Sequence, residues 1–175
     1  MLELVLIRIA DPPKSLIKEF PEKHAEFYFK YAKVVAETLR CHSFQSFLDW
    51  VIKKENINKD EVRDIRVIVF PSKNERGKRL AGRCSKRGQI SIYPKGIKAI
   101  LRLLVKNKKE KLGFYLKKRA MSTLIHELLH VKYLDDEERV RELTKSYFDV
   151  FNLHRQRRDQ RSQRQVKYLN MFSRA

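Results

Sequence analysis

Cysteine is scarce in this chain of 175 residues, and long apolar runs are missing. The two cysteines, Cys41 and Cys84, are too few for a disulfide framework and lack the paired spacing of a zinc–thiolate site, so we expect reduced thiols in an intracellular protein. No apolar run approaches the ~20 residues that a membrane-spanning helix needs. The apolar opening MLELVLIRIA has neither a basic leader nor a small-residue cleavage site. The sequence therefore predicts a soluble, cytoplasmic protein with no membrane span.

Acidic residues are in deficit, because 21 Asp+Glu face 40 Lys+Arg and leave a formal charge of +19. So large a charge repels itself in a compact fold, and it predicts an anionic partner, with nucleic acid first and an anionic membrane surface second. Adaptation to heat, which enriches Lys, Arg and Glu in surface networks, is the alternative; it explains the density of charge but not its sign. The hydrophobic share of 42% excludes wholesale disorder, and the length fits one domain.

The order of apolar patterns along the chain predicts an α+β fold with a small mixed sheet. In chain order we expect a strand over residues 2–10, helices over 22–40 and 43–54, strands over 64–71 and 83–94, and helices over about 95–107, 113–133 and 136–153. Aromatic residues of the first two helices, among them Phe29, Phe47 and Trp50, recur at helical spacing and are expected in the core. Residues 1–153 would form one domain, followed over 154–175 by a basic tail with seven Lys/Arg and one acid.

The stretch STLIHELLHVKYL contains the motif HELLH inside the predicted helix 113–133. His126 and His130 are four residues apart, so their imidazoles share one helix face and can reach a single Zn²⁺ at ~2.0–2.1 Å. Glu127 lies at the rim of that face, where it can accept a proton from water and later give one to a leaving amine. The pattern favours a hydrolytic zinc site; the alternative is an amphipathic helix with two solvated histidines.

A catalytic zinc site needs a third protein ligand, and an acidic cluster follows the motif at residues 135–138. We favour Glu138, because a helix starting near Asp136 would place it in the first turn beside the histidines. Glu137 is the competing ligand, since its face also contains Val140 and Thr144, and Asp136 is the third choice. Glu142, one turn further along, could orient a ligand histidine. Acids in a first helical turn also stabilise the helix dipole without any metal.

HELLH followed by a glutamate-bearing helix resembles the zincin metallopeptidases of the gluzincin type, and the small size resembles the minimal gluzincins. The preceding RLAGRCSKRGQISIYP resembles the strand before the active-site helix of SprT-like zincins. The resemblance spans about residues 79–148 and implies a single zincin-like domain, zinc-dependent peptide hydrolysis, and substrate binding along Gln89–Tyr93 by β-augmentation. It also gives Tyr133 two readings, as a stabiliser of the oxyanion or as a packing residue. The metzincin glycine and the third histidine of SprT-like proteins have no counterpart here.

Two functions follow from these observations. The first is a zinc metallopeptidase acting on peptides or proteins, including, as the SprT-like resemblance implies, proteins bound to nucleic acid. The second is a nucleic-acid-binding protein with a structural or vestigial zincin fold. The apolar end of the tail, QVKYLNMFSRA, suggests a segment that enters the cleft beside Gln89–Tyr93 and holds the enzyme latent, as in some minimal gluzincins; packing of this segment on the domain is the alternative.

Overall fold

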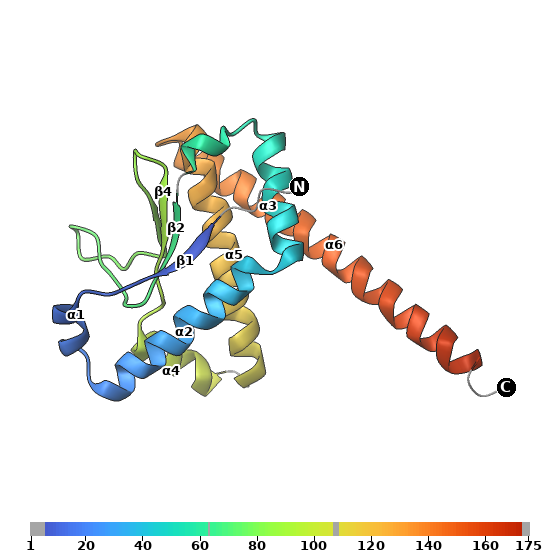
Figure 1. Cartoon of the computed structure of the whole chain (residues 1–175), viewed down its shortest axis with the longest axis horizontal. Coiled ribbons are helices and arrows are strands. Elements are labelled where there is room, and N and C mark those ends of the chain that lie inside the picture. The colour runs from blue at the N-terminus through green and yellow to red at the C-terminus, as the bar shows by residue number, and fades with distance from the viewer. Residues whose placement is uncertain (1–5, 63, 107–108, 173–175) are drawn as a thin grey trace.

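A four-stranded mixed sheet forms one layer of the fold in the computed structural model, which describes residues 6–62, 64–106 and 109–172 (Figure 1). The strand order is β1-β2-β4-β3. The first three of these, β1 (Ile7–Ala10), β2 (Asp64–Ile68) and β4 (Gln89–Ile92), run parallel, and β3 (Gly82–Cys84) closes the edge antiparallel to β4. The predicted α+β class is therefore confirmed, with six α-helices among the described residues.

The predicted strand 83–94 is wrong in one respect, because a hairpin turn over residues 85–88 divides it into β3 and β4. Gly88 makes this turn possible through its positive φ of +73°, and its N–H donates to the carbonyl of Ser85 at 2.9 Å. As a consequence, residues 89–92 lie inside the sheet between β2 and β3. The edge strand that can accept a further strand on this side is β3, and not Gln89–Tyr93 as the sequence suggested.

The helices are α1 (Lys14–Lys18), α2 (Glu22–Arg40), α3 (His42–Lys54), α4 (Ile97–Lys106), α5 (Lys109–Tyr133) and α6 (Glu137–Phe172), with a short 3₁₀ helix η1 (Lys59–Glu61). Helices α2 and α5 pack against each other and against the sheet. The core lies between these two layers. Its centre is formed by residues without any exposed surface, namely Ala32, Ala36, Leu39, Ile65, Ile90, Leu124, Ile125, Leu128 and Leu129.

Two aromatic residues expected in the core lie at the surface. Trp50 is 40% exposed and Phe29 is 41% exposed. In α3 the inward face is already filled by Phe44, Leu48 and Val51, all completely buried, and the side chain of Trp50 projects beside that face. Its ring stacks under the Lys54 ammonium, with 4.9 Å between Nζ and the ring centroid. Helical spacing alone could not separate the edge of the apolar stripe from its centre.

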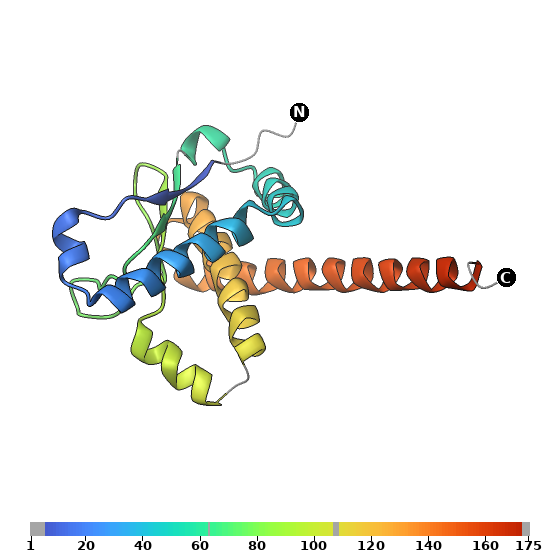
Figure 2. The same ribbon diagram turned by 60° about the horizontal axis from the view of Figure 1, so that its bottom comes forward.

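Helix α6 does not end near residue 153, as the sequence analysis predicted, but continues to Phe172. The 36 residues contain no glycine or proline, and the Arg, Gln and Lys of its second half are good helix formers. Figures 1 and 2 show this half leaving the domain as a single rod. The tail segment 166–172 is therefore helical and directed away from the sheet, so the expected extended pairing in the cleft is not found. Among the described residues, no helix is long and apolar enough to span a membrane.

Candidate metal centre

Helix α5 holds the HELLH motif with one face in the core and one face in a cleft. Leu124, Ile125, Leu128 and Leu129 are completely buried beneath it. These four residues anchor the helix, and the residues between them are thereby turned to the opposite side. The side chains of His126 and His130 retain 24% and 19% of their exposure and lie with their Nε2 atoms 3.2 Å apart. The predicted pairing of the two imidazoles on one face is confirmed.

The end of α5 fixes the orientation of His130. Leu134 adopts a left-handed conformation with a φ of +48°, and its N–H donates to the carbonyl of His130 at 3.0 Å. This is the usual way to end a helix, although glycine normally occupies the position. The carbonyl of Leu134 then lies 2.5 Å from His130 Nδ1. A ring whose Nδ1–H donates to this carbonyl has its Nε2 lone pair free, and that lone pair faces the cleft.

Glu137, the first residue of α6, completes the group. Its Oε2 lies 3.2 Å from His130 Nε2 and its Oε1 lies 3.6 Å from His126 Nε2. Arg141, one turn further along, donates from Nε to Glu137 Oε1 at 2.7 Å and steadies the carboxylate. Among the described residues, these three are the only group of metal-ligating side chains with ligand atoms close together, all within 4.8 Å.

The preferred third ligand from the sequence, Glu138, lies elsewhere. Asp136 caps α6, accepting from the N–H of Arg139 at 3.1 Å, so the helix proper begins one residue later than expected. Glu137 consequently takes the inward position of the first turn, and Glu138 is rotated by about 100° into solvent, where it is exposed. Glu142 is also exposed and pairs with Arg139 at 3.1 Å.

Thr144, and not Glu142, lies beside the second ring nitrogen of a histidine of this group. Its hydroxyl donates to the carbonyl of Val140 at 2.7 Å, and its oxygen lies 3.5 Å from His126 Nδ1. The hydroxyl oxygen can therefore accept from Nδ1–H and leave Nε2 of His126 free, as the carbonyl of Leu134 does for His130. Burial lowers the pKa of His126, which favours the neutral imidazole that a metal requires.

The spacing of the three ligand atoms fits a small divalent metal. In a tetrahedral site with bonds of about 2.0–2.1 Å, neighbouring ligand atoms are about 3.3 Å apart. The two Nε2 atoms of His126 and His130 lie 3.2 Å apart, Glu137 Oε2 lies 3.2 Å from His130 Nε2, and the other carboxylate oxygen, Oε1, lies 3.6 Å from His126 Nε2. With one atom taken from each residue, all three ligand atoms lie within 4.8 Å of one another. Such a ligand set leaves further coordination positions, and the group lines a cleft of about 1010 Å³ with room for a substrate. The residues present thus fit a metal with an open position.

Glu127 lies at the bottom of the same cleft, where its side chain packs against β3 and is almost completely buried. The residue is 7% exposed, and a Cβ added to Gly82 would lie only 2.5 Å from its Oε1. Burial raises the pKa of Glu127 to about 7, although the charge of His130 and a hydrogen bond from the backbone of Cys84 lower it in part. Gly82 is not among the site residues predicted from the sequence. It lies just before the predicted strand 83–94, and an isolated glycine beside a strand can mark a close approach of two chain segments.

The hairpin between β3 and β4 forms the facing wall of the cleft. Its residues Arg83, Lys86 and Arg87 are exposed, and η1 supports the turn from below. A Cβ at Gly88 would lie 1.5 Å from the carbonyl oxygen of Glu61, so the turn rests directly on η1. In the described part of the chain β3 is bonded to a neighbouring strand on one side only, which leaves its outer edge available to an extended peptide.

Tyr133 is a packing residue. Its hydroxyl is turned toward Glu55 and not toward His126, His130 and Glu137, which we call the metal group. Its hydroxyl donates to Glu55 Oε2 at 2.6 Å, the hydroxyl of Tyr147 bonds the other carboxylate oxygen, and Lys132 lies 3.1 Å from Oε2. Burial acts to raise the pKa of Glu55, but these three donors outweigh it and hold the pKa below its usual value. The cluster joins the end of α3 to α5 and α6 and stabilises the corner on which the metal group lies.

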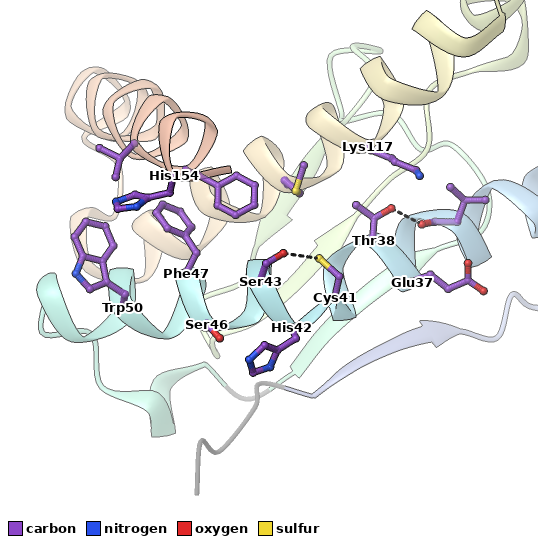
Figure 3. Close-up of a pocket in the computed structure, with 14 residues that line it drawn as sticks. Glu37, Thr38, Cys41, His42, Ser43, Ser46, Phe47, Trp50, Lys117 and His154 are labelled. Atoms are coloured by element: carbon purple, nitrogen blue, oxygen red, sulfur yellow. Dashed lines mark hydrogen bonds between the residues drawn. The ribbon is translucent and has the colours of Figure 1, made fainter. Parts of the chain in front are cut away.

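A second hollow, of about 1050 Å³, lies between α2, α3, α5 and α6 (Figure 3). Phe47, Trp50 and Phe151 form its apolar part, and His42 and His154 lie at its rim. No residue of the metal group lines it. His42 and His154 belong to no group of metal-ligating side chains in the described part of the chain.

No protein-family model, curated protein or solved structure matches the chain. The function of the protein is therefore inferred from the geometry of the cleft.

Proposed function

We propose that this protein is a zinc-dependent peptidase whose metal is held by His126, His130 and Glu137. The observation that carries the proposal is the close triangle of their ligand atoms beside a buried carboxylate, Glu127, that belongs to the same helix. A purely structural metal site would have no use for Glu127, which makes no contribution to the triangle. Two imidazoles and one carboxylate are a donor set typical of Zn²⁺.

The bound ion would supply a lowered pKa for a coordinated water and polarisation of the scissile carbonyl. Glu127 accepts the proton of the attacking water, so that the hydroxyl oxygen can bond to the carbonyl carbon of the peptide. When the C–N bond breaks, Glu127 returns that proton to the leaving nitrogen, giving a carboxylic acid and an amine. The contact with Gly82 and the backbone of Cys84 keeps the carboxylate in one position during both transfers.

The substrate backbone would lie along the outer edge of β3, antiparallel or parallel to Gly82–Cys84. Main-chain hydrogen bonds to an edge strand bind a peptide largely independently of its side chains. Since a Cβ at Gly82 would lie 2.5 Å from Glu127 Oε1, a peptide bonded to this strand would run close to the proposed general base.

Two variants test the proposal. Glu127→Gln should retain one zinc per chain and lose peptide hydrolysis by a factor of about 10² or more, because the amide cannot accept the proton. His126→Ala should lose the zinc itself, measured by metal analysis of the purified protein. Hydrolysis of a fluorogenic peptide at the parent rate by Glu127→Gln would disprove the mechanism, and a full zinc content in His126→Ala would disprove the ligand assignment.

The second candidate function, binding of nucleic acid, is favoured by the sequence of the α6 rod. Between His154 and Phe172 the rod has six Lys/Arg and one acid. A basic helix free of the domain can follow a phosphate backbone, and such binding weakens steeply with salt because counterions are released. Truncation after Phe151 should reduce the salt slope of DNA binding. If DNA binding did not depend on salt, or if no binding occurred at low salt, heat adaptation would remain as the explanation of the charge of +19.

A further inference from the structure

Helix α4 exposes apolar side chains that the fold does not cover. Val105 is 89% exposed, Leu101 is 53% exposed and Leu104 is 36% exposed. At 100° per residue, the apolar positions of α4 span about 200° of its circumference. Ile100 is buried on one side of this arc, whereas Leu101 and Val105 lie on the other side in solvent. The apolar stripe is therefore wider than the contact with the domain requires.

Cationic side chains border the uncovered part of the stripe. Lys98 and Arg102 follow Val105 around the helix, and both are outside the core. Neither of them pairs with a carboxylate in the part of the chain that the structure describes. In the sequence between Lys95 and Arg119 there are ten Lys/Arg and a single acid, Glu110, which gives this segment a net charge of +9.

Two aromatic residues of α5 extend the same end of the molecule. Phe114 is 48% exposed and Tyr115 is 39% exposed. The hydroxyl of Tyr115 accepts from Lys95 Nζ at 3.0 Å, which places this ring beside the start of α4. Figure 2 shows α4 and the first turns of α5 as an angled pair that projects from the domain on the side away from the β3–β4 hairpin. Aromatic rings with a polar tip are enriched at the headgroup level of bilayers.

We propose that this pair of helices binds the surface of a bilayer with anionic headgroups. The α4 surface, by which we mean Leu101, Leu104, Val105, Lys98 and Arg102, would place its aliphatic side chains at the acyl boundary and its cations among the headgroups. Ten residues are too few to span a bilayer, so α4 would lie in the plane of the interface. The inference is independent of the metal chemistry.

Other occupants fit the α4 surface less well. In a dimer formed through this surface, the segment 95–119 of one copy, with a net charge of +9, would face the same segment of the other copy, and the two would repel each other. Nucleic acid would satisfy the cations but would leave Leu101 and Val105 in water, since phosphate contacts use no aliphatic groups. An anionic bilayer satisfies both kinds of side chain at once. Tyr115 and His126 are eleven residues apart on α5, so the docked metal group would lie on the order of 16 Å from the membrane end of that helix.

Flotation of the full-length protein with vesicles tests the inference. We expect binding to phosphatidylcholine vesicles containing about 30% phosphatidylserine and little binding to phosphatidylcholine alone. The double variant Leu101→Gln/Val105→Gln should bind the anionic vesicles at least roughly tenfold more weakly, because it lacks the aliphatic contacts. Lys98→Gln/Arg102→Gln should also weaken binding at least roughly tenfold. The matched control is Val34→Gln/Leu153→Gln, which removes two aliphatic residues of α2 and α6 that are 42% and 54% exposed, and it should bind like the parent.

Each other outcome overturns the inference. Failure of the parent chain to float, or equal flotation with neutral vesicles, would exclude an anionic bilayer as the partner. Undiminished flotation of Leu101→Gln/Val105→Gln would show that α4 does not insert. Should the same variant instead convert a dimer to a monomer in sedimentation, the surface would be a contact between copies. If only DNA binding responded to Lys98→Gln/Arg102→Gln, the surface would serve nucleic acid. Thermal melting checks that the variants fold; we expect unchanged Tm values because all six replaced side chains are exposed.

Discussion

Replacement of Gly82 by alanine should impair the proposed hydrolysis without touching a metal ligand. A methyl group at this position of β3 would lie 2.5 Å from Oε1 of Glu127, 2.6 Å from its Cγ and 2.7 Å from Cγ2 of Thr123. Ordinary van der Waals contacts of a Cβ begin near 3.4 Å. The φ of Gly82 is not in the left-handed region, so alanine causes no backbone strain here and the effect is purely one of space.

The magnitude follows from how the collision can be relieved. Either β3 moves away from α5, or the buried side chain of Glu127 moves by about 1 Å. Overpacking of this kind costs about 1–3 kcal/mol, which corresponds to a decrease in Tm of several degrees, roughly 2–4 °C per kcal/mol, in a chain of this size. A catalytic group displaced by about 1 Å loses on the order of 10² in kcat/KM. Zinc content should stay at the parent value, because His126, His130 and Glu137 keep their positions.

The assays are peptide hydrolysis, metal analysis and thermal melting of the same preparations. Gly113→Ala is the matched control, since Gly113 lies in α5 and a Cβ there would meet nothing within 4 Å. Alanine in a helix is favoured over glycine by roughly 0.5–1 kcal/mol, so this variant should melt slightly higher and retain full activity. Parent-like hydrolysis by Gly82→Ala would refute the assignment of Glu127 as the general base held by β3. Loss of zinc in Gly82→Ala would refute the separation of the base from the ligand set.

Three further predictions concern the turn, the buried carboxylate and the third ligand. Gly88→Ala should cost about 3 kcal/mol or more, because its methyl would meet a backbone carbonyl of η1 at 1.5 Å; Gly77→Ala, at an equal positive φ but in open space, should cost only about 1 kcal/mol in chemical denaturation. Glu55→Gln should lower stability by roughly 2–3 kcal/mol near neutral pH; since the pKa of Glu55 is depressed in the fold, the difference in Tm from the parent should shrink as the pH falls below about 4. Glu137→Gln should weaken zinc binding more than about tenfold in a competition assay, while Glu138→Gln should bind like the parent; equal losses in both would remove the assignment.

The parts of the site that the sequence predicted are those that one helix determines by itself. HELLH lies in α5 as expected, because the four core leucine and isoleucine residues of this segment fix its rotation and thereby the direction of His126 and His130. The general placement of the acidic cluster beside the histidines was also predictable. Because the chain reverses directly after α5, the first turn of α6 has to lie beside the last turns of α5.

The remaining features depend on single-residue details or on contacts between distant segments. Whether Glu137 or Glu138 faces the histidines depends on the residue at which α6 begins. A helix start is known from sequence only to within one or two residues, and a shift of that size turns a different side chain toward the cleft. The contact of Gly82 with Glu127 joins segments 45 positions apart, which no local pattern encodes. The division of residues 83–94 into two strands required the turn chemistry of Gly88, which was present in the sequence as the dipeptide Arg-Gly before an alternating run.

The left-handed residue Leu134 makes the ligand set unusually self-contained. His126, His130 and Glu137 fall within twelve consecutive residues, and only the corner at Leu134 has to form for the last of them to face the other two. The entropy of closing so short a loop is small compared with that of bringing β3 to α5 across 45 residues. Heating or denaturant should therefore separate the proposed base from its supporting strand at a point where the corner would still hold a metal ion bound by the three ligands. The proposed peptidase would then pass through a state that keeps its metal but cannot hydrolyse peptides, and removal of the denaturant would restore hydrolysis without renewed uptake of metal.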